Sequence, residues 1–182
     1  FGDANNAEVS SLAQYDGYLY AITDHEEGGG AQIWRCQTCD GSDWSQVVAD
    51  GFGDSYLRDI PGLEVYNQKL YTVIGHPYNG LEVWRTSDGL NWEQIGFAGF
   101  GDSNNDAIYR DNPLAVFDGS FYVGTLNYVN GGEVWMYEEL PLPPSDFDGD
   151  GASDPAKFYA SSGTVWWLQS SDDSWESTWL GS

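Results

Sequence analysis

The chain has 182 residues, 41% of them hydrophobic and 16% aromatic, and 29 acidic against 6 basic side chains give it a net charge of −23. Such a surface repels the phosphates of nucleic acids and of anionic lipids, so the charge argues against partners of those two kinds. Because no run of 18 apolar residues occurs, we expect no segment that inserts into a membrane.

Three long repeats begin with the phrase FGD, at residues 1, 52 and 100. They continue with the matching phrases LAQYDGYLYAIT, LEVYNQKLYTVI and LAVFDGSFYVGT, and then with AQIWR, LEVWR and GEVWM. Repeats of this length with about four short strands each are typical of a β-propeller. We therefore expect an all-β propeller of about four blades, each a four-stranded antiparallel sheet, either partial or completed by another chain.

The first repeat, residues 1–51, contains both cysteines of the chain, Cys36 and Cys39, in the phrase CQTC. A redox pair of this spacing normally begins a helix, and two thiols alone cannot complete a four-ligand zinc site. In a β-hairpin the pair is better interpreted as a disulfide that closes a turn in an oxidising compartment. The chain opens with FGDANN and no initiator Met, so we interpret it as a mature or partial segment of a longer precursor.

The second repeat, residues 52–99, shows the strand pattern most clearly. Apolar runs separated by turn residues predict its strands at 62–66, 69–75, 81–86 and 92–96. Runs such as LYTVI are apolar without strict alternation, which indicates burial on both faces.

The third repeat, residues 100–140, lacks the DGxxW ending of the first two and leads into a proline-rich linker at 141–145. Its FGD turn is followed by Asn104 and Asn105. Asp and Asn commonly stabilise turns through bonds to their own backbone, so a corner between blades is one interpretation of this turn. Contact of the two asparagines with a glycan or an ion is the other.

Basic residues recur at equivalent places in the loops. Arg58 and Arg110 follow the FGD turns, and His25 and His76 follow the second predicted strand of their repeats. Two arginines are too few for the arginine cluster of a sialidase-type site. The histidines are either separate loop residues or a metal pair on neighbouring blades.

The last segment, residues 146–182, begins with the loop DFDGDGASD. Calcium takes six to eight oxygen ligands from a flexible loop, and alternate residues of a curled loop point inward. We expect Ca²⁺ as the cofactor here, bound by carboxylates and by one backbone carbonyl, from Asp146, Asp148, Asp150, Ala152 and Asp154.

After this loop, GTVWWLQSSDDSWES matches the end of the second repeat, so the segment is interpreted as a partial fourth repeat. Its Trp166 and Trp167 are adjacent and therefore face opposite sides of a strand. One of the two is a candidate surface for stacking on a sugar ring.

The phrase DFDGDGASDPAKFYASSGTVWWLQSSDD resembles the FG-GAP, or VCBS-like, repeats of bacterial secreted proteins. The resemblance implies a calcium loop between strands of a propeller blade, with the ligands named above. The three long repeats are similar to the sialidase-like, Asp-box and tachylectin-like propeller repeats of bacterial extracellular proteins.

From these observations we expect a secreted or cell-surface propeller that is not an enzyme. The leading hypothesis is non-catalytic binding of glycans or proteins. The second is a building block of an extracellular filament or surface layer, self-associating through blades or edge strands. The third is a propeller-type glycosidase.

Overall fold

The computed structural model describes residues 5–25, 29–57, 60–107, 112–137, 156–159, 164–168 and 174–179. The chain divides into two compact units, Phe1–Tyr137 and Glu138–Ser182, and each forms its own sheets. The linker expected at 141–145 and the calcium loop at 146–154 lie outside the described residues.

The first unit consists of three antiparallel sheets, each with its strands in sequence order. The first blade contains β1 (Asn6–Tyr15), β2 (Tyr18–His25), β3 (Gln32–Cys36) and β4 (Ser45–Val48). The second blade contains β5 (Gly62–Tyr66), β6 (Lys69–Ile74), β7 (Glu82–Thr86) and β8 (Glu93–Ile95). The third blade contains β9 (Leu114–Phe117), β10 (Ser120–Gly124) and β11 (Val134–Tyr137). The four strands predicted for the second repeat are confirmed.

The first hairpin of each blade has a two-residue turn with positive φ at both residues. The turns are Asp16-Gly17, Asn67-Gln68 and Asp118-Gly119. This conformation matches the twist of the paired strands, and it explains why Gly, Asn and Asp dominate at these places.

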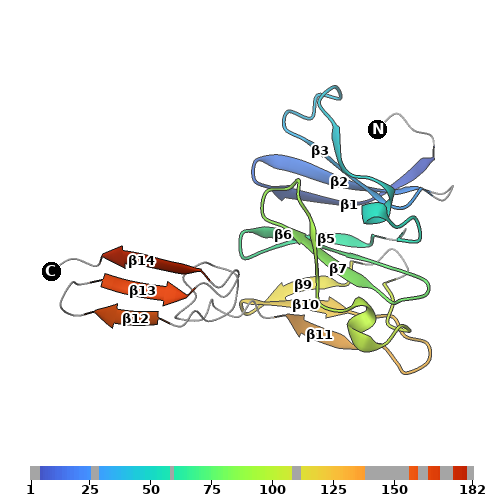
Figure 1. Ribbon diagram of the computed structural model, residues 1–182. Coiled ribbons are helices and arrows are strands. Elements are labelled where there is room, and N and C mark those ends of the chain that lie inside the picture. The colour runs from blue at the N-terminus through green and yellow to red at the C-terminus, as the bar shows by residue number, and fades with distance from the viewer. Residues whose placement is uncertain are drawn as a thin grey trace. The chain divides into compact units, whose positions relative to one another are not determined.

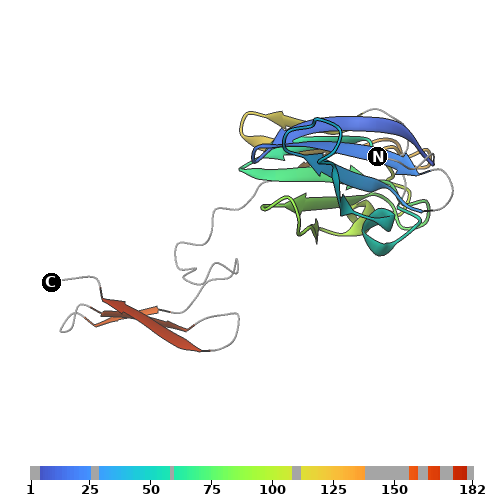
Figure 2. The same cartoon turned by 90° about the horizontal axis from the view of Figure 1, so that it is seen from above.

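The three blades pack face to face in chain order, as Figure 1 shows from β1 to β11, and the first blade lies over the others in Figure 2. One core cluster joins the first blade to the second, and another joins the second to the third. The first strands β1, β5 and β9 contact one another in succession. This is the blade arrangement of a β-propeller, and the described residues form no closed ring.

After β4 and β8 the chain makes the same short 3-10 turn, η1 (Asp50–Gly53) and η2 (Ala98–Gly101). The residues that follow complete the FGD turns and bond to the loop between the second and third strands of the blade just left. The bonds run from the amides of Ala31 and Leu81 to the carbonyls of Leu57 (2.9 Å) and Asn105 (2.7 Å), and from the amides of Gly51 and Gly99 back to the carbonyls of Ala31 and Leu81. The FGD turns are therefore corners between blades.

The second unit contains a three-stranded antiparallel sheet of β12 (Ala156–Tyr159), β13 (Thr164–Leu168) and β14 (Trp175–Trp179). Trp166 and Trp167 lie in β13, opposite Lys157 and Ala156 of β12. In the described part of the chain, no helix is long and apolar enough to cross a membrane.

Candidate functional site

Polar residues with a capacity for chemistry gather where the FGD turns meet the loops between second and third strands. Asp54 lies beside the β6–β7 loop, and Asp102 lies beside the β10–β11 loop. Each aspartate accepts a bond from the backbone two residues later, from Tyr56 and Asn104 respectively, both at 2.9 Å. The repeat thus places one carboxylate at the same point of two successive corners.

At the first of these corners, the imidazole of His76 is buried and lies 3.4 Å from the carboxylate of Asp54, measured from Nε2 to Oδ2. His76 Nδ1 accepts bonds from the backbone amides of Tyr78 (3.1 Å) and Asn79 (3.0 Å). A neutral imidazole in this position carries its proton on Nε2, which faces the carboxylate. His76 is therefore held by its own loop, with Nε2 beside the carboxylate of Asp54.

Two exposed aromatic rings flank this pair. Tyr56 and Tyr78 are 47% and 68% exposed, and their rings meet edge to face with centroids 5.4 Å apart. Both rings lie 6.0 Å from the ring of His76. The corner thus combines an aromatic surface, a solvent-accessible carboxylate and an imidazole.

At the second corner, Asn127 takes the place that His76 has at the first. Its Oδ1 accepts bonds from two loop amides, and its Nδ2 donates to Asp102 Oδ2 (3.0 Å) and to Asn105 Oδ1 (2.9 Å). The Nδ2 of Asn130 also donates to Asp102 Oδ2, at 2.8 Å. Amide and imidazole therefore occupy equivalent places, since each accepts bonds from its loop and has a nitrogen beside the aspartate. Asn127 Nδ2 donates to Asp102, and His76 Nε2 lies 3.4 Å from Asp54.

These donors act on the charge of Asp102. Its pKa falls from 3.8 to about 2, chiefly because the backbone amide of Asn104 donates to the carboxylate, with further bonds from the side chains of Asn130, Asn104 and Asn127. Asp102 is therefore ionised over the whole physiological range of pH.

The two predicted ligand-binding asparagines differ in the structure. Asn105 is fully buried, and its Nδ2 donates to the carbonyl of Gly99 (3.0 Å) and to Glu133 Oε2 (2.9 Å). Asn104 is exposed and donates to Asp102. Asn105 thus belongs to the corner, and only Asn104 faces solvent.

The recurring tryptophans are held by one repeated bond. The indole nitrogens of Trp34, Trp84 and Trp135 donate to Gln32, Glu82 and Glu133 at distances of 2.9 to 3.1 Å. Since the partner lies two residues earlier in the chain in every blade, this bond is part of the scaffold.

Cys36 and Cys39 form a disulfide at the end of β3. The carboxylate of Asp43 accepts bonds from the backbone amides of Gln37 (2.9 Å) and Thr38 (2.6 Å) within the same turn. The pair closes a turn, in the manner that the sequence predicts.

Other predicted site residues are not brought to this corner by the described structure. Arg58, Arg110 and all five calcium ligands lie outside the described residues. The described ranges contain no group of three or more His, Cys, Asp or Glu side chains suited to a metal ion. His76 uses Nδ1 for two backbone bonds, which leaves only Nε2 facing Asp54.

Sequence reasoning did not single out Asp54, Tyr56 and Tyr78 as a group. An alignment of the second repeat on the third contains the signal, because it pairs Asp54 with Asp102 and His76 with Asn127. An aspartate and its contact residue that recur together at equivalent places of two repeats indicate a shared contact.

Comparison with protein families gives no match, and comparison with curated proteins gives none either. Solved structures do show similarity. An α-L-arabinofuranosidase from Clostridium thermocellum is 14% identical, with 86% of this chain and 61% of that chain covered and a TM-score of 0.46. A β-fructofuranosidase from Bombyx mori, in complex with sucrose, is 14% identical over 90% of this chain and 43% of that one, with a TM-score of 0.46. A thermostable family-43 glycoside hydrolase is 14% identical over 86% of this chain and 61% of that one, with a TM-score of 0.44.

The chain spans 61% or less of the length of these three structures. These similarities contradict our expectation of a non-catalytic binding or building protein and the expectation that the chain is not an enzyme. The three similar solved structures named above are glycoside hydrolases, and two others are arabinanases.

Proposed function

We propose that the chain is part of a propeller-type glycosidase, and that the corner of Asp54, Tyr56, His76 and Tyr78 contacts its sugar substrate. The observation that carries the proposal is the exposed pair of tyrosine rings beside a carboxylate held by a buried histidine. It is independent of the similarity to solved structures.

A sugar ring has apolar C–H faces and a rim of hydroxyl groups. Tyrosine rings offer an apolar body with a polar tip, and binding sites combine such rings with a few well-placed polar groups. Tyr56 and Tyr78 supply the rings, and Asp54 supplies an acceptor for hydroxyl groups. The net charge of −23 favours a neutral sugar over an acidic one.

Hydrolysis of a glycosidic bond ordinarily uses two carboxyl groups on opposite sides of the bond. Asp54 is the one that we assign, as nucleophile or general base, because it is accessible and its Oδ2 lies 3.4 Å from Nε2 of the buried His76. His76 is a positioning residue in this proposal and touches no reacting atom.

The test is hydrolysis of aryl α-L-arabinofuranoside, aryl β-D-xyloside and sucrose by the purified chain. Asp54→Asn should lower kcat/KM by at least about a hundredfold. Tyr78→Ala should raise KM with a smaller effect on kcat, because the ring contributes binding. Asp102→Asn is the matched control, since it removes the same carboxylate from the next repeat and should leave kcat/KM unchanged.

Two outcomes would reject the proposal. One is the absence of any substrate hydrolysis together with no sugar binding by calorimetry. The other is equal activity of the Asp54→Asn variant and the wild type. Thermal unfolding of each variant separates a loss of activity from a loss of fold.

We also propose that the loop of residues 146–154 binds calcium through Asp146, Asp148, Asp150, Ala152 and Asp154, in an FG-GAP-like repeat. The spacing of the four carboxylates supports it. Ca²⁺ should raise the melting temperature of the wild type, and the double variant Asp148→Ala, Asp150→Ala should lose that rise. Equal melting of the wild type in calcium and in chelator would reject the site.

We further propose that the protein works outside the cell or on its surface. The Cys36–Cys39 disulfide supports this location, because such bonds persist in oxidising compartments. Protein alkylated without reduction should show no labelled cysteine in its mass spectrum, and two labelled cysteines would contradict the proposal.

A further inference from the structure

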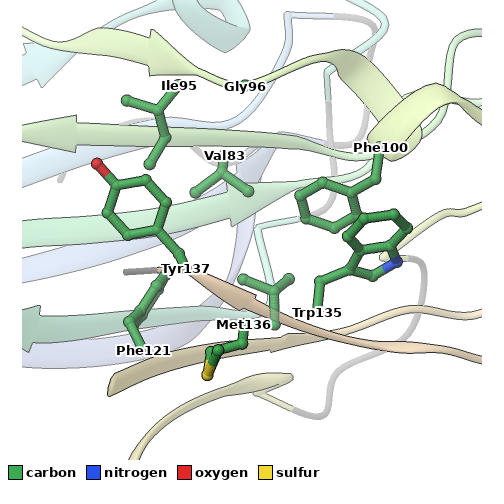
Figure 3. Close-up of a pocket in the computed structure, with 9 residues that line it drawn as sticks. Val83, Ile95, Gly96, Phe100, Phe121, Trp135, Met136 and Tyr137 are labelled. Carbon is green, nitrogen blue, oxygen red and sulfur yellow. The ribbon is translucent and has the colours of Figure 1, made fainter. Parts of the chain in front are cut away.

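An apolar pocket of about 180 Å³ lies between the second and third blades. Figure 3 shows it lined by Val83 and Ile95 of the second blade, by Phe100 of the turn η2, and by Phe121, Trp135 and Tyr137 of the third blade. Ile95, Phe100 and Tyr137 also pack against the core that joins these two blades. The pocket is therefore continuous with an interface inside the protein.

The equivalent place between the first and second blades is filled by a tryptophan. Phe52 stacks on Trp84 with centroids 4.3 Å apart, and Trp92 meets the same ring edge to face at 5.8 Å. Trp92 stands immediately before β8, the fourth strand of the second blade. The fourth strand thus brings the indole that completes the interface.

The third blade reproduces only half of this arrangement. Phe100 stacks on Trp135 at 4.7 Å, in the manner of Phe52 on Trp84. In the described residues no fourth strand pairs with β11 and no aromatic ring takes the part of Trp92, so Trp135 is 39% exposed. An edge strand of this kind is a template for another strand.

We propose that the pocket and the edge of β11 together bind an extended strand of another polypeptide, whose tryptophan fills the pocket. An engineered cavity of ~150 Å³ lined by apolar side chains takes up benzene, so this pocket has room for an aromatic ring. The strand adds to β11 in the antiparallel sense in which β8 pairs with β7.

The chain itself shows which residues such a strand needs. In both complete blades a tryptophan is followed by any residue, glutamine and then Val or Ile, as Trp44 by Val47 and Trp92 by Ile95. Within the second blade, Ile95 of β8 pairs with Val83 on the neighbouring strand β7. Because the protein carries a charge of −23, the partner strand should be neutral or basic outside this motif.

The experiment measures binding of a dye-labelled peptide of residues 89–96, GLNWEQIG, by fluorescence anisotropy. It is run in 0.5 M salt, at roughly the ionic strength that screens the repulsion between two acidic chains. We expect saturable binding, weakened at least about tenfold when the peptide carries alanine in place of Trp92, because buried tryptophans dominate such interfaces.

Protein variants provide the matched control. Trp135→Ala removes a wall of the pocket and should weaken binding of the peptide by a similar factor. Trp34→Ala changes the equivalent residue of the first blade, away from the pocket, and should leave binding unchanged. Equal binding of the two peptides, equal loss in both protein variants or no saturable binding would overturn the proposal. Concentration-dependent dimers in sedimentation without peptide would overturn it too, since the occupant would then be a second copy.

Discussion

The second and third blades share the same repeated sequence pattern but lie in different surroundings. Tyr66 of the second blade is 6% exposed because the third blade covers it, whereas Phe117, at the equivalent position, is 72% exposed. Tyr71 is fully buried, and its equivalent Tyr122 is only partly so. The repeated sequence therefore gives each blade an apolar face, and the presence of a neighbouring blade determines whether that face is buried.

The glycines before each third strand show the same contrast at the corners. A Cβ on Gly30 or Gly80 would lie within 2.6 Å of the backbone of the following 3-10 turn, whereas one on Gly131 would meet nothing within 4 Å. All three have positive φ. Glycine is thus required at the first two positions by both the positive φ and the close backbone contact, and at the third by the positive φ alone.

The largest effect is expected for Gly80→Ala. Positive φ costs an L-residue about 1–2 kcal/mol, and the contact with Gly99 and Asn105 adds about 1–3 kcal/mol of overpacking. Gly131→Ala should pay only the first cost. Urea unfolding followed by tryptophan fluorescence measures the free energy of unfolding of both variants. Equal losses would show that the close contact at Gly80 adds no cost.

Trp84→Ala should come next, with a loss of about 3 kcal/mol, because Trp84 stacks on Phe52 in an interface that Trp92 completes. Trp135→Ala should cost about 1–2 kcal/mol, since its ring is partly exposed. A larger loss for Trp135→Ala would mean that the third blade is as well packed as the second.

A smaller effect is expected for Tyr66→Phe. The Tyr66 hydroxyl donates to the carbonyl of Gly119 in the next blade at 2.9 Å, and loss of one such bond costs about 1 kcal/mol. Phe117→Tyr, which adds a hydroxyl at an equivalent position that no other described blade covers, should change stability by less than about 0.5 kcal/mol. A clear gain from Phe117→Tyr would show that its hydroxyl finds a partner.

The smallest effect concerns acid. Because the pKa of Asp102 is depressed to about 2 in the folded chain, its carboxylate stabilises the fold above pH 3.8. That contribution is lost as the pH falls through about 2. The urea midpoint of the wild type should therefore fall more between pH 5 and pH 2 than that of Asp102→Asn, and parallel curves would contradict the bonding at this corner.

Much of the fold follows from the repeat. Two-residue turns, apolar runs and the FGD spacing are local patterns, and they predict the strands of the second blade to within a residue or two. The number of blades in the first unit and the exposure of its third blade depend on what lies beside each sheet. Local sequence patterns carry no information about such neighbours.

The candidate site was harder to predict for the same reason. Asp54 and His76 are 22 positions apart by their numbers and meet only because the corner folds back on the next loop. Asn105 looked accessible by residue type, yet its amide is used inside the corner. Residue type indicates capacity for binding, and only the path of the backbone decides whether the group faces solvent.

The exposed apolar face of the third blade makes the solubility of the protein depend on its acidic composition. Phe117, Val134 and Met136 are exposed there, and a surface of this kind invites precipitation. Mutual repulsion of chains with a charge of −23 opposes it at neutral pH. Near the isoelectric point of about 4.1 that repulsion vanishes, so solubility should pass through its minimum there and rise again on either side.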